Sequence, residues 1–305
     1  AIPAPAMESY PEPARVLVDE LRAAARRDPR RAIAFQGAPG AYSHQAVTRV
    51  AADALPLPCF SFEDALQAVT EGEAARAVLP VENSLHGRVA DVHFLLPESG
   101  LSIVGETYVK VSHCLLGVPD AGMADIREVL SHPQALGQCR HRLRALGVKP
   151  VAAADTAASG AEIMVRGERQ LGAIASALAA ELYGCTILVR DFEDAPHNRT
   201  RFLVLARSAS PGPVEGPAKT TLAVEVKNIP AALFKALGGF ATNGVNLTRL
   251  ESHLSGGSFT AAQFLIDIEG SPQDAAVARA LEELAFHSRW VRLLGTYPAA
   301  DPLAP

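Results

Sequence analysis

The run Ala32-Ile33-Ala34-Phe35 decides the fold class, because this short apolar strand leads through the turn Gly37-Ala38-Pro39-Gly40 into a helix from about Ser43. The same order of strand and helix follows twice more along the chain. The later pairs are Cys59-Phe60 with Phe62 to Glu71, and Ala77-Val78-Leu79 with Val89 to Leu96. Alternation of short strands with helices is typical of a mostly parallel sheet, so the sequence predicts an α/β fold.

A second set of short apolar runs follows Val111. The predicted strands are Leu115-Leu116-Gly117-Val118, Val129-Leu130, Val151 to Ala154, Ala173-Ile174 and Ile187-Leu188-Val189. A chain of 305 residues, 49% of them hydrophobic, is too long for one typical core. We therefore predict a two-lobed domain at residues 32–207, with one lobe at about 32–110 and 190–207 and the other at 111–189. In the first lobe, Ser61-x-x-Asp64 predicts a capping box.

Residues 208–218 are rich in proline, glycine and serine and predict a linker to a further domain at 219–298. The elements expected there follow the order β-α-β-β-α-β, which is the ferredoxin-like arrangement. They are Thr221 to Val226, Ala231 to Thr242, Leu247 to Ser252, a turn at Ser255-Gly256-Gly257, Phe259 to Ile268, Pro272 to Ala285, and Val291 to Tyr297.

The segment 1–31 is predicted to be an appendage. Ala1 to Pro13 is rich in alanine and proline and is expected to be disordered, while Val16 to Arg31 is typical of a short amphipathic helix with a charged end. The segment has no apolar core of signal-peptide length, and apolar runs elsewhere are too short to span a membrane. We therefore expect a cytoplasmic protein without a membrane partner.

Composition excludes several function classes. The net charge of -5 and the aromatic content of 6% give no footprint for nucleic acid. The four cysteines are widely spaced, and no histidine pattern matches a metal site. Neither G-x-G-x-x-G nor G-x-x-x-x-G-K-[ST] occurs, and G-x-S-x-G is missing as well. The sequence therefore predicts no metal, no nucleotide cofactor and no serine nucleophile.

Polar clusters occur where predicted strands end and helices begin. They are Gln36 to Ser43, Glu82-Asn83-Ser84, Ser131-His132-Pro133-Gln134 and Asp155-Thr156, and a further polar run, Asn198-Arg199-Thr200-Arg201-Phe202, precedes an apolar strand. In open α/β sheets this edge binds ligands, and helix N-termini there favour anions. Each cluster alone is also explained by helix capping. Their joint occurrence predicts a site for a small anion.

In this order the clusters resemble the prephenate dehydratase family, whose members make phenylpyruvate for phenylalanine synthesis. The resemblance runs from about Ala32 to Arg207. It rests on Phe35 to Ser43, Leu79 to Ser84, Ser131 to Leu136, Asp155 to Ser159 and Asn198 to Phe202. It implies two lobes similar to type II periplasmic binding proteins, with prephenate bound between them. The C-terminal domain resembles an ACT domain, a ferredoxin-like module that often senses amino acids.

The resemblance implies that Thr200 is the central catalytic residue, and we predict that its hydroxyl relays a proton to the leaving hydroxyl of prephenate. Arg201 is predicted to act electrostatically on a substrate carboxylate. Glu82 and His197 are the expected sources of the proton, since a threonine hydroxyl is a weak acid. The predicted substrate contacts are Asn83, Ser84, Ser131, Gln134, Thr156 and Phe202.

The ACT-like domain departs from the family at two positions. Ala231 stands where the family commonly has glycine, and His253-Leu254 stands where Arg-Pro is common. L-Phenylalanine is the expected effector, and the predicted contacts are Ala232, Leu233, Asn246, Glu251 and Ser252. A domain that only joins subunits is the alternative, and a homodimer or homotetramer is expected from its strand edges.

Other activities remain open at this stage. Arogenate dehydratase acts on the amino analogue of prephenate, and no residue decides between the two substrates. A prephenate decarboxylase is disfavoured, since such relatives are expected to lack the intact Thr200-Arg201-Phe202 motif. A non-catalytic binding protein or sensor of the same fold is the alternative from a different class.

Overall fold

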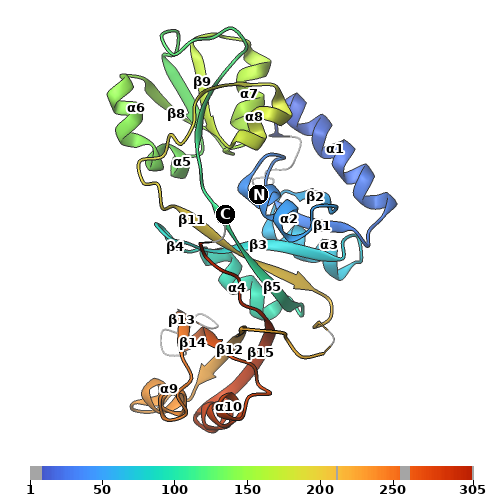
Figure 1. Cartoon of the computed structure of the whole chain (residues 1–305), viewed down its shortest axis with the longest axis vertical. Helices are drawn as coiled ribbons and strands as arrows, with labels where there is room; N and C mark the ends of the chain where they lie inside the picture. Colours follow the sequence, from blue (N-terminus) through green and yellow to red (C-terminus); the bar gives the residue numbers. More distant parts are fainter. Residues whose placement is uncertain (1–8, 211, 255–261, 304–305) are drawn as a thin grey trace, which may run out of the picture. The chain divides into compact units, whose positions relative to one another are not determined.

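The computed structural model describes residues 9–210, 212–254 and 262–303 (Figure 1). The chain forms two compact units: unit 1 contains residues 1–88 and 108–202, and unit 2 contains residues 89–107 and 203–305. The boundary falls within two strands, β5 (Ser102–Lys110) and β11 (Arg199–Ala206), so each strand supplies residues to both units.

The first lobe of unit 1 is built on a sheet with the strand order β2-β1-β3-β11-β5, in which β1 pairs in parallel with β2 and β3. This arrangement confirms the α/β fold class. Its elements besides β5 and β11 are β1 (Ala32–Gln36), α2 (Tyr42–Val50), β2 (Leu55–Cys59), α3 (Phe62–Thr70), β3 (Arg76–Asn83) and β4 (Gly87–Arg88). Ser61 caps α3, with both arms of the predicted capping box formed with Asp64.

The second lobe has its own sheet, with the order β10-β6-β9-β7-β8. Strands β7, β8 and β9 are parallel, whereas β6 runs antiparallel to both β9 and β10. The elements are β6 (Cys114–Gly117), β7 (Glu128–Ser131), α5 (Pro133–Gln138), α6 (Arg140–Leu146), β8 (Lys149–Ala152), α7 (Ala158–Arg166), β9 (Leu171–Ala175), α8 (Ala177–Tyr183) and β10 (Thr186–Val189). The two-lobed arrangement is therefore confirmed.

The N-terminal helix α1 (Glu12–Arg27) corrects the prediction of an appendage. It lies against β2 of the first lobe and α7 of the second. Ala14, Val18 and Ala25 are at most 2% exposed, and Tyr10 before the helix is buried as well. Three of these four residues (Tyr10, Ala14 and Val18) share one apolar cluster with residues of both lobes. The helix is thus part of the core of unit 1, and residues 12 and 13 are helical.

Unit 2 carries the ferredoxin-like domain. Its sheet has the order β13-β14-β12-β15, which is the arrangement expected for β-α-β-β-α-β, and its apolar core contains side chains from α9 and α10. The elements are β12 (Ala218–Val226), α9 (Ala232–Thr242), β13 (Leu247–Leu254), β14 (Ala262–Glu269), α10 (Ala275–His287) and β15 (Ser288–Pro298), with α4 (Ala90–Glu98) also in unit 2. The expected turn Ser255-Gly256-Gly257 and the start of the strand at Phe259 lie outside the described residues.

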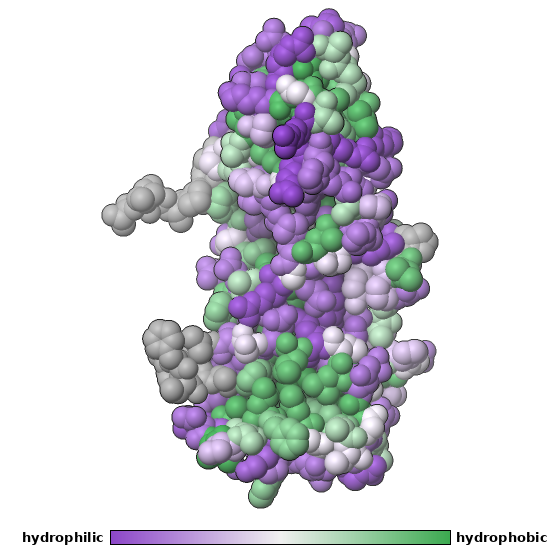
Figure 2. All heavy atoms as spheres, turned by 90° about the vertical axis from the view of Figure 1, so that its left-hand side faces the viewer, coloured by the Kyte–Doolittle hydropathy of each residue, from purple (hydrophilic) through white to green (hydrophobic). Residues whose placement is uncertain are grey.

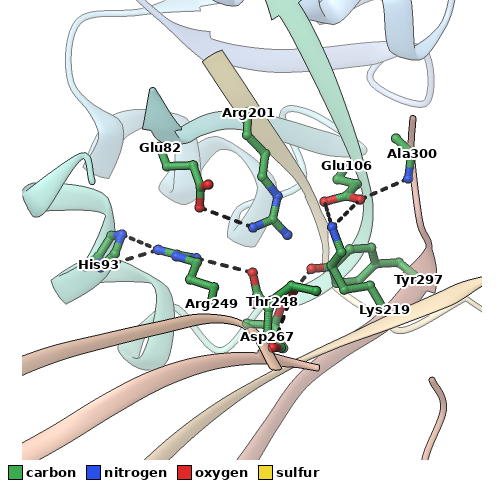
Figure 3. Close-up of polar contacts among 11 residues, drawn as sticks. Glu82, His93, Glu106, Arg201, Lys219, Thr248, Arg249, Asp267, Tyr297 and Ala300 are labelled. Carbon is green, nitrogen blue, oxygen red and sulfur yellow. Dashed lines mark hydrogen bonds and ion pairs between the residues drawn. The ribbon is translucent and has the colours of Figure 1, made fainter. Parts of the chain in front are cut away.

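Unit 2 also contains buried charged side chains in addition to its apolar core. Lys219 on β12 donates to both carboxylate oxygens of Glu106 on β5, at 2.8 and 3.1 Å, and the Glu106 side chain is fully buried (Figure 3). On β13, Arg249 contacts His93 of α4 and lies 3.7 Å from the Asp267 carboxylate. The charged groups of these pairs are buried, so removing one partner of a pair would lower the free energy of unfolding.

Candidate active site

The site begins where the end of β3 meets the start of β11. The side-chain nitrogen of Asn83 donates to the Thr200 hydroxyl oxygen at 3.0 Å and to the Asn198 side-chain oxygen at 2.7 Å. The Asn83 side-chain oxygen accepts from the backbone N–H groups of Leu85 and His86. Asn83 is therefore held at both ends of its amide, and it fixes the position of the Thr200 oxygen.

The Thr200 hydroxyl keeps its own hydrogen for another acceptor. Its oxygen accepts from Asn83, and a hydroxyl can donate one further hydrogen bond. Next to it, Asn198 is fully buried, and its side-chain nitrogen has no hydrogen-bond partner. A buried polar atom without a partner is uncommon in native structures. Thr200 and Asn198 both accept from the Asn83 nitrogen, and each retains a side-chain donor of its own.

Arg201 lies on the opposite side of the sheet from Thr200. Successive side chains of a strand point to opposite faces, and β11 includes both residues. The Arg201 guanidinium is 3.5 Å from the carboxylate of Glu82, the neighbour of Asn83 on β3, and the two side chains point toward one another (Figure 3). The strand geometry therefore places Arg201 and Glu82 on the face opposite Thr200, and their predicted roles stay predictions.

The second lobe reaches this site through Gln138 at the end of α5. The side-chain nitrogen of Gln138 lies 3.3 Å from His86 Nδ1, which is itself 3.3 Å from the Asn83 side-chain oxygen. The side-chain oxygen of Gln138 lies 2.6 Å from Nε2 of the buried His113. A chain of polar contacts therefore leads from Thr200 through Asn83 and His86 to Gln138. The sequence prediction missed Gln138, which lies one helical turn beyond Gln134.

The remaining predicted substrate contacts differ in their surroundings. Ser131 is fully buried and donates to the Ile174 carbonyl, and Phe202 is a core side chain with 2% exposure. Ser84 donates to the His197 carbonyl and accepts from the Arg199 N–H, so it fastens the end of β3 to the start of β11. Gln134 is exposed and Thr156 is half-buried. Their contacts with substrate stay predictions.

The glycine turn after β1 lies next to Asp155, as expected. The two segments hydrogen-bond to each other. The Ala38 N–H donates to Asp155, the Ser176 hydroxyl donates to the Gly40 carbonyl at 2.6 Å, and the Tyr183 hydroxyl donates to the Pro39 carbonyl at 2.7 Å. A β-carbon at Gly40 would lie 2.7 Å from the Ala179 backbone, so the close approach requires glycine. This turn joins the two lobes, and Asp155 is engaged in that join.

Burial favours the neutral form of two histidines, His44 on α2 and His113 just before β6. Burial lowers the pKa of His44 to about 4, and it also lowers the pKa of His113, against weaker raising effects of Gln138 and Glu193. Burial raises the pKa of Tyr42, whose hydroxyl contacts His113. These groups are neutral at pH 7. In the described residues, no cluster of His, Cys, Asp or Glu could hold a metal ion, and no helix there is long and apolar enough to cross a membrane.

The predicted effector residues do not all lie together in one chain. Strands β12 and β13 are both antiparallel to β14, so Glu251 and Ser252 lie toward the end of the sheet where β12 leads to α9 and Ala232. Asn246 lies at the other end of α9, a helix of 11 residues that is about 16 Å long. Leu233 is half-buried in the first turn of α9. Within one copy, Asn246 is therefore separated from the other four residues.

Fold and site together define a two-lobed α/β protein with a small polar site and an attached ferredoxin-like domain. Comparison with known proteins is consistent with this class. The family model for prephenate dehydratase matches residues 33–210. A protein of Komagataeibacter europaeus named bifunctional N-acyl-homoserine lactone acylase/prephenate dehydratase is 52% identical over 273 residues, which cover 88% of this chain and 96% of that protein.

Two further proteins extend this similarity. Arogenate dehydratase/prephenate dehydratase 1 of Arabidopsis thaliana, a chloroplastic protein, is 40% identical over 87% of this chain and 71% of its own length. The crystal structure of prephenate dehydratase from Arthrobacter aurescens in complex with L-Phe is 32% identical, with a TM-score of 0.82 over 90% of this chain and 92% of that one. The chain therefore belongs to the prephenate dehydratase family, whose named members here are prephenate and arogenate dehydratases.

Proposed function

We propose that this chain is a prephenate dehydratase that converts prephenate to phenylpyruvate, carbon dioxide and water. The observation that carries the proposal is the contact of 3.0 Å between Asn83 and the Thr200 oxygen, because it leaves the hydroxyl hydrogen of Thr200 available as a donor. In the reaction, the bond from the ring to the carboxylate breaks, its electrons complete the aromatic ring, and the ring hydroxyl leaves as water. The leaving oxygen needs a hydrogen-bond donor, and Thr200 supplies one.

Orientation of the substrate falls to neutral donors in this scheme. Asn198 offers a buried N–H group without a partner, and Gln138 approaches from the second lobe. Such groups suit the oxygens of a dianion held in a fixed orientation, which is the main task when aromatisation drives the reaction. Arg201 and Glu82 support the strand from the opposite face. His86, which contacts Asn83, is better placed than His197 to supply a proton to the Thr200 side.

The direct test is to incubate the protein with prephenate and with arogenate and to measure phenylpyruvate and phenylalanine. Phenylpyruvate from prephenate at a clearly higher kcat/KM supports the proposal. A preference for arogenate would assign the related activity, and no turnover of either substrate would leave the binding-protein alternative.

A second candidate activity follows from the relative in Komagataeibacter europaeus, whose name includes N-acyl-homoserine lactone acylase. The identity of 52% over most of both chains makes the same amide hydrolysis a specific candidate here. Release of homoserine lactone from an N-acyl-homoserine lactone tests it. A Thr200→Ala variant that loses dehydration but keeps acylase activity would place the two reactions at different sites.

The ferredoxin-like domain is proposed to bind L-phenylalanine as an ACT domain at residues 219–298, attached through the linker to the catalytic domain at 32–207. The similar crystal structure from Arthrobacter aurescens contains L-Phe, which supports this effector. Calorimetric titration with phenylalanine, together with activity measured at the same concentrations, tests the proposal. If phenylalanine produced neither heat nor inhibition, the effector proposal would be wrong and the domain would serve only to join subunits.

We also propose that this domain joins two copies of the chain, as a homodimer or a pair of dimers. Unit 2 exposes apolar atoms that gather in the lower part of Figure 2. Its exposed large apolar side chains include Phe234 at 80% and Leu250 of the edge strand β13 at 42%. Exposed apolar patches and unpaired strand edges favour association. Sedimentation of the wild-type chain and of a Phe234→Glu variant would test this role.

A further inference from the structure

Residues 89–107 form a segment that belongs to unit 2, whereas the chain before and after it belongs to unit 1. The segment contains α4 and the first part of β5. Both of its continuations lead to the active site. Asn83, which precedes the segment, donates to the Thr200 oxygen at 3.0 Å. Val111, which follows it, donates its backbone N–H to the Asn198 carbonyl at 2.9 Å. The segment is therefore flanked on both sides by residues that hold the site.

Within unit 2, a buried ion pair holds the β5 end of this segment. The Glu106 carboxylate accepts from Lys219 of β12 at 2.8 and 3.1 Å, and from the backbone N–H of Ala300 at 2.9 Å (Figure 3). The Glu106 side chain is fully buried, and the Lys219 side chain is 11% exposed. Separating the two would leave each charge buried without its partner, which is costly. Strand β5 is therefore expected to move together with β12.

The helix of the segment, α4, is held against β13. His93 is 1% exposed and contacts Arg249 of β13. The next residue, Phe94, meets the ring of His253 edge-on, with 5.5 Å between the ring centroids. Alternate residues of a strand point to the same face, so Glu251 shares its face of β13 with Arg249 and His253. Glu251 is a predicted effector contact, and it lies between two residues that touch α4.

We propose that residues 89–107 couple effector binding in the ferredoxin-like domain to the active site. An effector that shifts β13 or β12 moves α4 and β5 with it, and the continuous chain carries this shift to Asn83 and Val111. The extended strand from Glu106 to Val111 covers about 17 Å, and rigid elements of this kind carry coupling between sites. The effect on turnover rests on the proposed dehydratase and effector functions, whereas the mechanical coupling does not.

Two variants separate the coupling from a general loss of stability. The double variant Glu106→Gln with Lys219→Met removes the ion pair and leaves neither charge buried alone. Thr220→Val is the matched control, because Thr220 follows Lys219 on β12 and is fully buried. The Thr220 hydroxyl contacts the Gly270 carbonyl and the Thr296 hydroxyl, which both lie outside residues 89–107. Both variants lose buried polar contacts, but only the double variant loosens the segment.

Hydrogen exchange of the full-length variants tests the coupling without substrate or effector. The reporters are the backbone N–H groups of Ser84 and Val111, which donate to the carbonyls of Arg199 and Asn198 at the two ends of the segment. In the double variant both should exchange at least about fivefold faster than in the wild type. They should be unchanged in Thr220→Val, as should the amides of β9 in both variants. Unchanged exchange of Ser84 and Val111 in the double variant would overturn the proposal.

Inhibition by phenylalanine is then measured on the same proteins. Saturating phenylalanine should lower kcat/KM of the wild type and of Thr220→Val by about 5- to 150-fold, the usual range of coupling between two sites. The double variant should bind phenylalanine in calorimetry with a Kd within about threefold of the wild type, yet be inhibited less than about twofold. Full inhibition of the double variant would contradict the proposal. If the wild type binds no phenylalanine, the effector function is wrong, and the exchange rates still decide the coupling.

Discussion

Truncation of Val18 to alanine tests whether α1 belongs to the folded core, and Val16 provides a control on the same helix. Val18 is 2% exposed and Val16 is 51% exposed. Both substitutions remove the same two methyl groups and gain the same helix propensity, about 0.5 kcal/mol. The difference between the two variants therefore reports burial alone.

The expected magnitude follows from the buried methyl groups. Two buried carbons contribute about 1.6 kcal/mol by transfer, and the cavity left behind adds roughly 1 kcal/mol. After the gain in helix propensity, Val18→Ala should lower the free energy of unfolding by about 2 kcal/mol, while Val16→Ala should change it by less than about 0.5 kcal/mol. Urea unfolding followed by far-UV circular dichroism measures both. Equal midpoints for the two variants would show that α1 is not docked on the lobes.

Four further predictions concern the site and the stability of each unit. Thr200→Ala should lower kcat by at least about 10²-fold, with binding of a substrate analogue nearly unchanged and partial activity in Thr200→Ser; a loss under tenfold in steady-state assays would remove Thr200 from its role. Ala231 has a φ of 58°, in the left-handed region, so Ala231→Gly should raise the thermal midpoint of unit 2 by an amount equivalent to about 1 kcal/mol; an unchanged or lower midpoint would contradict this strain. The folded-state pKa of His44 is lowered to about 4, so neutral His44 contributes its full share of the free energy of unfolding above pH 6.5 and loses it as the pH falls toward 4. Denaturation at several pH values should show this free energy falling by about 3 kcal/mol in the wild type but not in His44→Gln. Glu106→Gln leaves Lys219 buried without its carboxylate and should cost about 3 kcal/mol in chemical denaturation, whereas the double variant with Lys219→Met should recover most of it.

Much of the fold could be predicted from local patterns. The alternation of apolar runs and helices identified both lobes, and the order of elements identified the ferredoxin-like domain. Strand β5 was not predicted, because its sequence has no continuous apolar run and only every third position (Ile103, Glu106 and Val109) is buried. Helix α1 was predicted as a helix but not as a core element. Its buried positions include Ala14 and Ala25, and alanines give little hydrophobic contrast in a sequence.

The sequence brought together some residues that are in contact in the structure and missed others. Asn83 and Thr200 were expected to act together, and the structure places them in contact. Arg201 was assigned to the same side because the segment was interpreted as a loop before a strand. In the structure β11 already begins at Arg199, so strand alternation separates Arg201 from Thr200. Gln138 could have been found from its spacing of four residues after Gln134, which places both on one face of a helix.

The docking of α1 also has a consequence for how the chain folds during synthesis. The helix leaves the ribosome early, but its apolar partners include Ala157, Leu171 and Tyr183, which are made more than a hundred residues later. Contacts between distant parts of a sequence form slowly, and domains generally fold as units during translation. Strand β2 is made soon after α1, but until the second lobe is made the nascent chain exposes the part of α1 that packs on that lobe. Protection of this segment by a chaperone would matter most before residue 183 emerges.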